Sequence, residues 1–178
     1  TNQVNLIDST DLKYPVSVIV SPDGKNVYVA SRQSSCIVYW DRDSTTGALT
    51  NKRIQTDDTN GVGQDGKEAY LFRELSSITV SPDGKNVYAT TLYCPTYTAL
   101  GCVISWIRDS TTGALTNQIN QCHTAIEDCR DVAVFDRYVY GAAKGIGHGI
   151  IMRWQRDTDI GVNTAHNNPL FSGRIINP

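Results

Sequence analysis

Two polar segments of the chain hold the titratable side chains that could do chemistry together. His123, Glu127 and Arg130 lie close together in the sequence, and Arg73 and Glu74 precede an apolar, β-branched run. A histidine beside a carboxylate can act as general base and general acid, and a nearby arginine can stabilise an oxyanion. The candidate acid–base pair is therefore His123 with Glu127 or Glu74, and Arg73 or Arg130 is the candidate oxyanion-stabilising group. Polar loops commonly collect such residues, so this catalytic role stays a hypothesis.

Other site chemistries fit the sequence less well. His148 lies in the glycine-rich segment 144–149, but the GxGxxG spacing of a phosphate-binding loop is missing there, and a turn is expected. The acidic segment 41–47 has its glycine at the seventh position rather than the sixth, which does not fit a calcium loop. No CxxC or paired-histidine spacing favours zinc, and no serine-elbow motif occurs. We therefore expect no metal and no cofactor.

The five cysteines give a hypothesis about the compartment. Cys94 and Cys102 bracket one polar loop, and Cys122 and Cys129 bracket another. A disulfide across each loop would limit its freedom in the unfolded chain. Cys36 would then remain, either buried as a small apolar residue or available to another chain. Two disulfides predict an oxidising, extracellular compartment.

The elements that must position these residues follow from an internal repeat. SPDGKNVY occurs twice and RDSTTGALT occurs twice, and a third, divergent copy has Asp136-Arg137 where SPDGK stood. The occurrences are 21–28 and 81–88, 42–50 and 108–116, and, for the third copy, 131–140 and 152–161. Matches of nine consecutive residues are not chance, so the chain is a repeat protein.

Each unit predicts four short strands separated by turns, because β-branched runs alternate with Pro-Asp-Gly and Thr-Thr-Gly. The expected strands are 16–20, 26–31, 36–41 and 48–55; 76–80, 86–91, 102–107 and 114–121; and 131–135, 138–142, 150–155 and a weaker 162–165. Four-stranded units repeated at this length are typical of β-propeller blades. The fold class predicted is all-β, about three blades in an incomplete ring plus a leading outer strand, since Thr1–Asn5 matches Thr116–Asn120. The expected divisions are 1–15 outer strand and lead-in, 16–75 first blade, 76–130 second blade, and 131–178 third blade and tail.

One tryptophan occurs in each unit, at Trp40, Trp106 and Trp154, two residues before an arginine. A residue repeated once per blade is explained by packing between blades, so these tryptophans are expected in blade contacts rather than in a binding site.

The units SPDGKNVYVAS…IVYWDRDSTTGALT and SPDGKNVYATT…VISWIRDSTTGALT resemble the lactonase-like, YVTN-type β-propeller family over residues 16–161. The resemblance implies a propeller fold. That family includes sugar-lactone hydrolases and also surface or secreted proteins. The matched motifs belong to turns and strands, so no active-site residue is carried over.

Composition excludes several classes of function. Sixteen Lys plus Arg against eighteen Asp plus Glu give a net charge of -2, without the basic excess of a nucleic-acid binder. No apolar run approaches the roughly 20 residues of a membrane helix, so membrane insertion is not expected.

Three blades do not readily close a ring, and a chain that begins at Thr1 suggests processing or excision. We therefore expect a homo-oligomer or polymer: an extracellular or cell-surface structural or adhesive module that assembles through open blade edges. The alternatives are a lactonase-like hydrolase with an axial site, and a propeller that binds carbohydrate or another extracellular protein.

Overall fold

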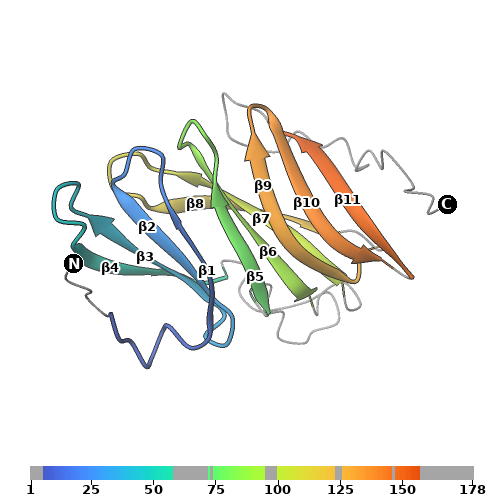
Figure 1. Ribbon diagram of the computed structural model, residues 1–178, viewed down its shortest axis with the longest axis horizontal. Coiled ribbons are helices and arrows are strands. Elements are labelled where there is room, and N and C mark those ends of the chain that lie inside the picture. Colours follow the sequence, from blue (N-terminus) through green and yellow to red (C-terminus); the bar gives the residue numbers. More distant parts are fainter. Residues whose placement is uncertain are drawn as a thin grey trace.

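The computed structural model describes residues 6–57, 72, 74–94, 100–122, 126–145 and 147–156. These residues form eleven strands in three antiparallel sheets. They include no helix, and so none that could cross a membrane. The sheets lie side by side along the chain (Figure 1), and we call them blades 1, 2 and 3.

Within each blade the strands follow one another in sequence order, each paired with the next. Blade 1 contains β1 (Pro15–Val20), β2 (Asn26–Ser31), β3 (Cys36–Arg42) and β4 (Leu49–Gln55). Blade 2 contains β5 (Leu75–Val80), β6 (Asn86–Cys94), β7 (Leu100–Arg108) and β8 (Leu115–Cys122). Blade 3 contains β9 (Asp128–Phe135), β10 (Tyr138–Gly145) and β11 (His148–Gln155).

The all-β fold predicted from the repeat is confirmed, and every expected strand that falls on described residues is present. The strands β6, β7, β9 and β10 are longer than expected, because pairing continues into the residues that precede or follow the repeated motifs. The expected fourth strand of blade 3, at 162–165, and the leading strand at residues 1–5 lie outside the described residues.

The repeated turn explains why β1 and β2 form a hairpin. Ser21 Oγ donates to Asp23 Oδ1 at 2.6 Å and accepts from the Asn26 amide at 3.0 Å. Gly24, at a φ of 70°, supplies the left-handed conformation that the turn needs. Blade 2 repeats these contacts with the same distances between Ser81, Asp83 and Asn86. A serine and an aspartate therefore satisfy the backbone where the chain reverses.

The first strand of each blade is its inner strand. β1 packs beside β5, and β5 packs beside β9, so the three inner strands line one side of the arc (Figure 1). Each of them carries a register shift at its beginning. Tyr14, Glu74 and Asp128 directly precede the equivalent positions Pro15, Leu75 and Cys129, and they share one edge.

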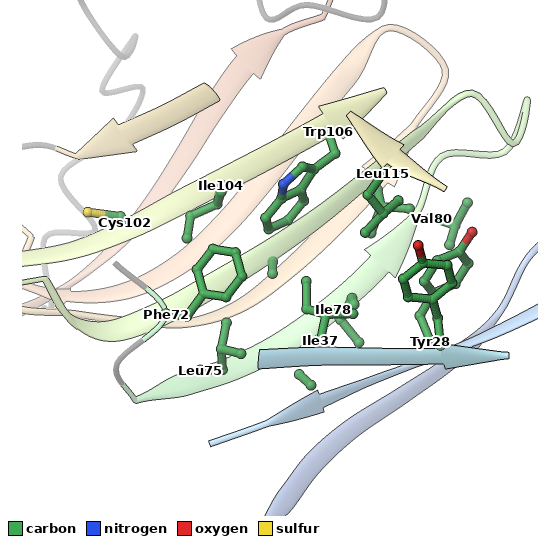
Figure 2. Packing of buried hydrophobic residues seen from close by; sticks show 14 residues of the cluster. Tyr28, Ile37, Phe72, Leu75, Ile78, Val80, Cys102, Ile104, Trp106 and Leu115 are labelled. Atoms are coloured by element: carbon green, nitrogen blue, oxygen red, sulfur yellow. The ribbon is translucent and has the colours of Figure 1, made fainter. Parts of the chain in front are cut away.

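Apolar side chains fill both junctions between blades. Between blades 1 and 2, Phe72 and the Trp106 ring meet edge to face, with centroids 5.5 Å apart. Figure 2 shows them pointing toward the same space as Ile37 of blade 1, with Tyr28 of blade 1 toward the other end of the cluster. Between blades 2 and 3, Trp154 packs in a second cluster. Burial of these apolar faces holds the blades against one another.

Candidate functional site

One buried arginine joins blade 2 to blade 1. The Arg108 side chain is 1% exposed and reaches the turn between β1 and β2. Its Nη2 donates to the two carboxylate oxygens of Asp23 at 2.9 and 3.1 Å and to Asn26 Oδ1 at 2.6 Å. Its Nε donates to the Tyr28 phenol at 3.0 Å, and its Nη1 donates to the carbonyl of Gly84 in its own blade at 3.0 Å. We call Asp23, Asn26 and Tyr28 the first socket.

The same contact joins blade 3 to blade 2. Arg156 Nη2 donates to Asp83 Oδ2 at 2.6 Å, and its Nη1 donates to Asn86 Oδ1 at 2.9 Å. Its Nε donates to the Asp136 carbonyl of its own blade at 2.8 Å. We call Asp83, Asn86 and Tyr88 the second socket. Each junction is therefore held by an arginine at the end of the third strand of one blade, inserted into the first turn of the preceding blade.

Charge and burial act together in both sockets. Burial acts to raise the pKa of Asp23 and Asp83, but the turn serine, the inserted arginine and a backbone amide donate to each carboxylate, and the net pKa lies below the ordinary 3.8. Burial also raises the pKa of Tyr28 and Tyr88 to about 12, so both phenols stay protonated at neutral pH. The sockets are thus anionic sites matched to a guanidinium, whose planar donors suit a carboxylate.

A glycine brings the third turn of blade 2 against the first socket. Gly113 has a φ of 73°, and a Cβ there would lie 2.5 Å from atoms of the Asn26 side chain. The carbonyl of Gly113 also accepts a hydrogen bond of 2.7 Å from the Tyr28 hydroxyl. The repeated RDSTTGALT segment therefore supplies both parts of the junction, the inserted arginine and the close-packed glycine.

The aspartate in that segment has a local role. Asp43 Oδ1 accepts from the amides of Thr45 and Thr46, at 2.9 and 2.7 Å. Asp109 accepts from the amides of Thr111 and Thr112 in the same way, at 2.8 and 2.7 Å. Backbone capping at these turns accounts for the acidic residue.

The edge of the arc where the inner strands begin carries mostly charged side chains from these strands and from the neighbouring second strands and turns. We call this edge the rim and define it as Tyr14, Arg32, Glu74, Glu127, Asp128, Arg130 and Lys144. Tyr14 and Glu74 both have a positive φ, of 59° and 60°. Arg32 Nε donates to the Leu75 carbonyl at 3.1 Å and lies 3.8 Å from a carboxylate oxygen of Glu74. The guanidinium of Arg32 also lies over the ring of Tyr14.

The structure places three of the five catalytic candidates on this rim, each with a separate partner. Glu74 pairs with Arg32, Glu127 pairs with Lys144 at 2.8 Å, and Arg130 pairs with Asp128 at 2.7 Å. No hydrogen bond or ion pair joins Glu74, Glu127 and Arg130 to one another among the described residues. The other two candidates, His123 and Arg73, lie outside the described residues.

The predicted disulfide pairing is wrong for the cysteines that the structure describes. Cys102 is bonded to Cys122, with Cα atoms 4.3 Å apart, and Cys129 is a buried free thiol. The register of β7 and β8 sets Cys102 directly opposite Cys122, so the bond crosses two strands instead of closing a loop. The side chain of Cys94 lies outside the described part, and Cys36 is buried with its thiol 3.5 Å from the Asp11 carbonyl.

The three tryptophans occupy equivalent strand positions but different surroundings. Trp106 lies in the cluster between blades 1 and 2, and Trp154 lies in the cluster between blades 2 and 3. Trp40 packs with Cys36 and Val38 on the other face of blade 1, which no second blade covers in the described structure.

Among the described residues, no group of three or more His, Cys, Asp or Glu side chains could hold a metal ion. Sequence reasoning missed the two sockets, although one signal pointed to them. The divergent third unit keeps the arginine, as Arg156, while it has lost SPDGK. An arginine retained without its own turn indicates that it serves the turn of another unit.

The chain matches no protein-family model, and no curated protein matches it. Solved structures do share its fold. A provisionally named 6-phosphogluconolactonase from Bacteroides uniformis has a TM-score of 0.64 at 19% identity, over 88% of this chain and 40% of that one. A second protein with the same provisional name, from Bacteroides fragilis, has a TM-score of 0.64 at 21% identity, over 88% of this chain and 39% of that one. A Lactobacillus plantarum protein has a TM-score of 0.60 at 22% identity, over 84% of this chain and 40% of that one.

These likenesses place the described sheets in the class of β-propellers. The chain spans about 40% of the length of these structures. At such low sequence identity the comparison shows the fold alone.

Proposed function

We propose that the three blades belong to a closed lactonase-like propeller that hydrolyses a sugar lactone at the rim. The observation that carries the proposal is the alignment of the inner strands, which brings carboxylates and cations together at the edge of the arc where these strands begin. The fold shared with two provisionally named 6-phosphogluconolactonases supports the same substrate class.

The rim residues have the chemistry that lactone hydrolysis needs. A carboxylate such as Glu74 can accept a proton from water as the water oxygen adds to the lactone carbonyl. A cation such as Arg130 can stabilise the negative charge that develops on the carbonyl oxygen. The ring C–O bond then breaks as the protonated Glu74 returns its proton to the ring oxygen, so the opened sugar carries an alcohol and a carboxylic acid, and the acid releases its proton to water. Lys144 and Arg32 supply further positive charge for an anionic substrate.

The test is hydrolysis of sugar lactones by the purified chain, monitored as the release of acid at constant pH. We expect Glu74→Gln and Arg130→Met to lower the rate at least about tenfold, within the range that such groups contribute. Arg137→Met is the matched control, because Arg137 lies exposed at the other end of β9, in the turn before β10. His123→Ala is a further variant, chosen from the sequence. A rate no greater than that of buffer, or an equal rate in all variants, would contradict the proposal.

A second candidate is a structural module that acts by assembly, as the incomplete ring suggested. Apolar side chains exposed on both outer blades favour it: Val18 and Val20 on blade 1, and Phe135 and Ile151 on blade 3. Large exposed apolar patches commonly mark interaction sites. Light scattering on the purified chain tests this candidate. A concentration-dependent dimer or larger species is expected, and a monomer at all concentrations would contradict assembly between copies.

A further inference from the structure

One face of blade 1 is open, whereas the equivalent faces of blades 2 and 3 are buried. The pairing register places seven apolar residues on this face. They are Val18, Val20, Val27, Val29, Val38, Trp40 and Ile54, which we call the open face. The N-terminal segment covers one part of it, where Leu12 packs against the cluster of Cys36, Val38 and Trp40.

Exposure distinguishes the open face from its equivalents. Val18 and Val20 are 65% and 44% exposed, whereas Ile78 and Val80, at the same positions of blade 2, are 4% and 8% exposed. In blade 3, the equivalent of Val18 is Val132, which is 5% exposed. The two buried faces are covered by the preceding blade. The open face has the same design and, in the described structure, no blade on it.

Blade 1 also carries the arginine that forms the polar contact at the other two junctions. Arg42 occupies the position of Arg108 and Arg156, and its Nη1 donates to the Gly24 carbonyl at 3.1 Å, as Arg108 does to Gly84 at 3.0 Å. This is the half of the contact that lies within one blade. Within the part of the chain that the structure describes, Arg42 forms no ion pair with a carboxylate.

The glycine of the repeated segment gives the same indication. Gly47 has a φ of 75°, like the 73° of Gly113, and no described atom lies within 4 Å of the position that a Cβ would take. In blade 2 that space holds the Asn26 side chain of the preceding blade. An asparagine of another blade would fill the space beside Gly47.

We propose that the open face of blade 1 is a docking surface for a further blade of the same repeat type, which precedes blade 1 in the order of the ring and offers an Asp-x-x-Asn-x-Tyr turn to Arg42. The carboxylate and amide oxygens of that turn match the donors of the guanidinium in charge and geometry. The sequence supports a blade that precedes blade 1, because Thr1–Asn5 closely matches Thr116–Asn120, which belongs to a fourth strand.

A second copy of this chain does not supply that turn. Its first and second sockets are already filled by Arg108 and Arg156. Its third blade has Asp136-Arg137 in place of SPDGK, and Tyr138 stands where the other turns have asparagine. The blade that docks here must therefore carry a socket that these 178 residues do not leave free. The inference does not depend on lactone hydrolysis.

The test adds such a blade to the chain. A copy of residues 6–74 is placed directly ahead of residues 15–178, so that the natural connection leads from the added blade into β1. Amide hydrogen exchange in β1 and β2 of the original blade is compared with that of the unextended chain. We expect exchange to slow by at least about tenfold, which corresponds to about 1.4 kcal/mol of added local stability.

Two variants assign the gain to the proposed contact. Arg42→Met in the original blade and Asp23→Ala in the added blade should each remove most of the slowing, while Arg137→Met should leave it unchanged. Exchange that does not slow, or slowing that Arg42→Met leaves intact, would overturn the proposal.

Light scattering on the unextended chain is a second test of which molecule occupies the open face, and it remains valid even if the added blade fails to fold. We expect Arg42→Met to leave its molar mass unchanged. A dimer or polymer that dissociates in Arg42→Met would identify a second copy as the occupant and overturn the proposal.

Discussion

The replacement Arg108→Met should destabilise the chain far more than Arg42→Met, although both arginines stand at the same position of the repeat. Methionine keeps much of the apolar stem and removes the guanidinium. At Arg108 this deletes the contacts to Asp23, Asn26 and Tyr28 across the junction. At Arg42 it deletes, within the described part of the chain, one side-chain hydrogen bond, to the carbonyl of Gly24.

The magnitude follows from burial. Removing one partner of a buried ion pair costs about 3–5 kcal/mol. The Asp23 side chain is 31% exposed and keeps its hydrogen bond from Ser21, so part of its charge stays solvated. We therefore expect a loss at the lower end, about 3 kcal/mol, for Arg108→Met. For Arg42→Met we expect less than about 1 kcal/mol, the usual effect of losing a single partly exposed contact.

Urea denaturation of both variants and the parent chain, followed by tryptophan fluorescence and far-UV circular dichroism, measures the two free energies of unfolding. Coincidence of the two signals shows whether a two-state analysis holds. Equal losses in the two variants, or a loss below about 1 kcal/mol for Arg108→Met, would refute the role assigned to the first socket.

Four further outcomes are expected. The socket aspartates have a lowered pKa in the folded chain, so the stability that their ionised form contributes is complete above the ordinary pKa of 3.8 and is lost as pH falls through the folded-state pKa. The urea midpoint should therefore decrease between pH 6 and pH 2, and it should decrease less steeply in Arg108→Met. Gly113→Ala should cost more than Gly47→Ala by at least about 1 kcal/mol in the same assay, because both have a positive φ but only the first meets a neighbouring side chain. Thr56→Cys should form a disulfide with Cys36, seen as lost thiols by mass spectrometry, since these positions correspond to Cys122 and Cys102. Trp106→Ala should lower stability by about 3–5 kcal/mol, and an unchanged melting curve would contradict its packing role.

The sequence was sufficient for the strands and insufficient for the register. Pro-Asp-Gly and Thr-Thr-Gly turns with β-branched runs between them predict the hairpins, because turn chemistry is local. The disulfide depends on a β-bulge. Counting from the Arg108–Leu115 pair without a bulge would set Cys102 opposite Gln121. A register shift near Asn117, which has a φ of 53°, moves Cys122 into that place.

The candidate site, too, could be predicted from the sequence only in part. Loops before the inner strands were expected to carry the charged residues, and the rim contains Glu74, Glu127 and Arg130. Their partners are Arg32, directly after the second strand of blade 1, and Lys144, in the second strand of blade 3. Both lie at the edge where the inner strands begin, and no motif in the sequence marks that proximity. Apart from the retained Arg156, no sequence signal marks the sockets either, since their contacts join residues more than 70 positions apart.

Thiol labelling tests most directly that blade 1 bears an open copy of a face that blade 2 buries. Val18→Cys and Ile78→Cys place one thiol at each of two equivalent positions, and iodoacetamide labelling is followed at each by peptide mass spectrometry. The buried thiols of Cys36 and Cys129, with pKa values raised to about 11 and about 12, should react slowly. We predict labelling of Val18→Cys at the rate of an exposed thiol and of Ile78→Cys at least about 100-fold more slowly, in keeping with exposures of 65% and 4%. Equal rates at the two positions would contradict the account.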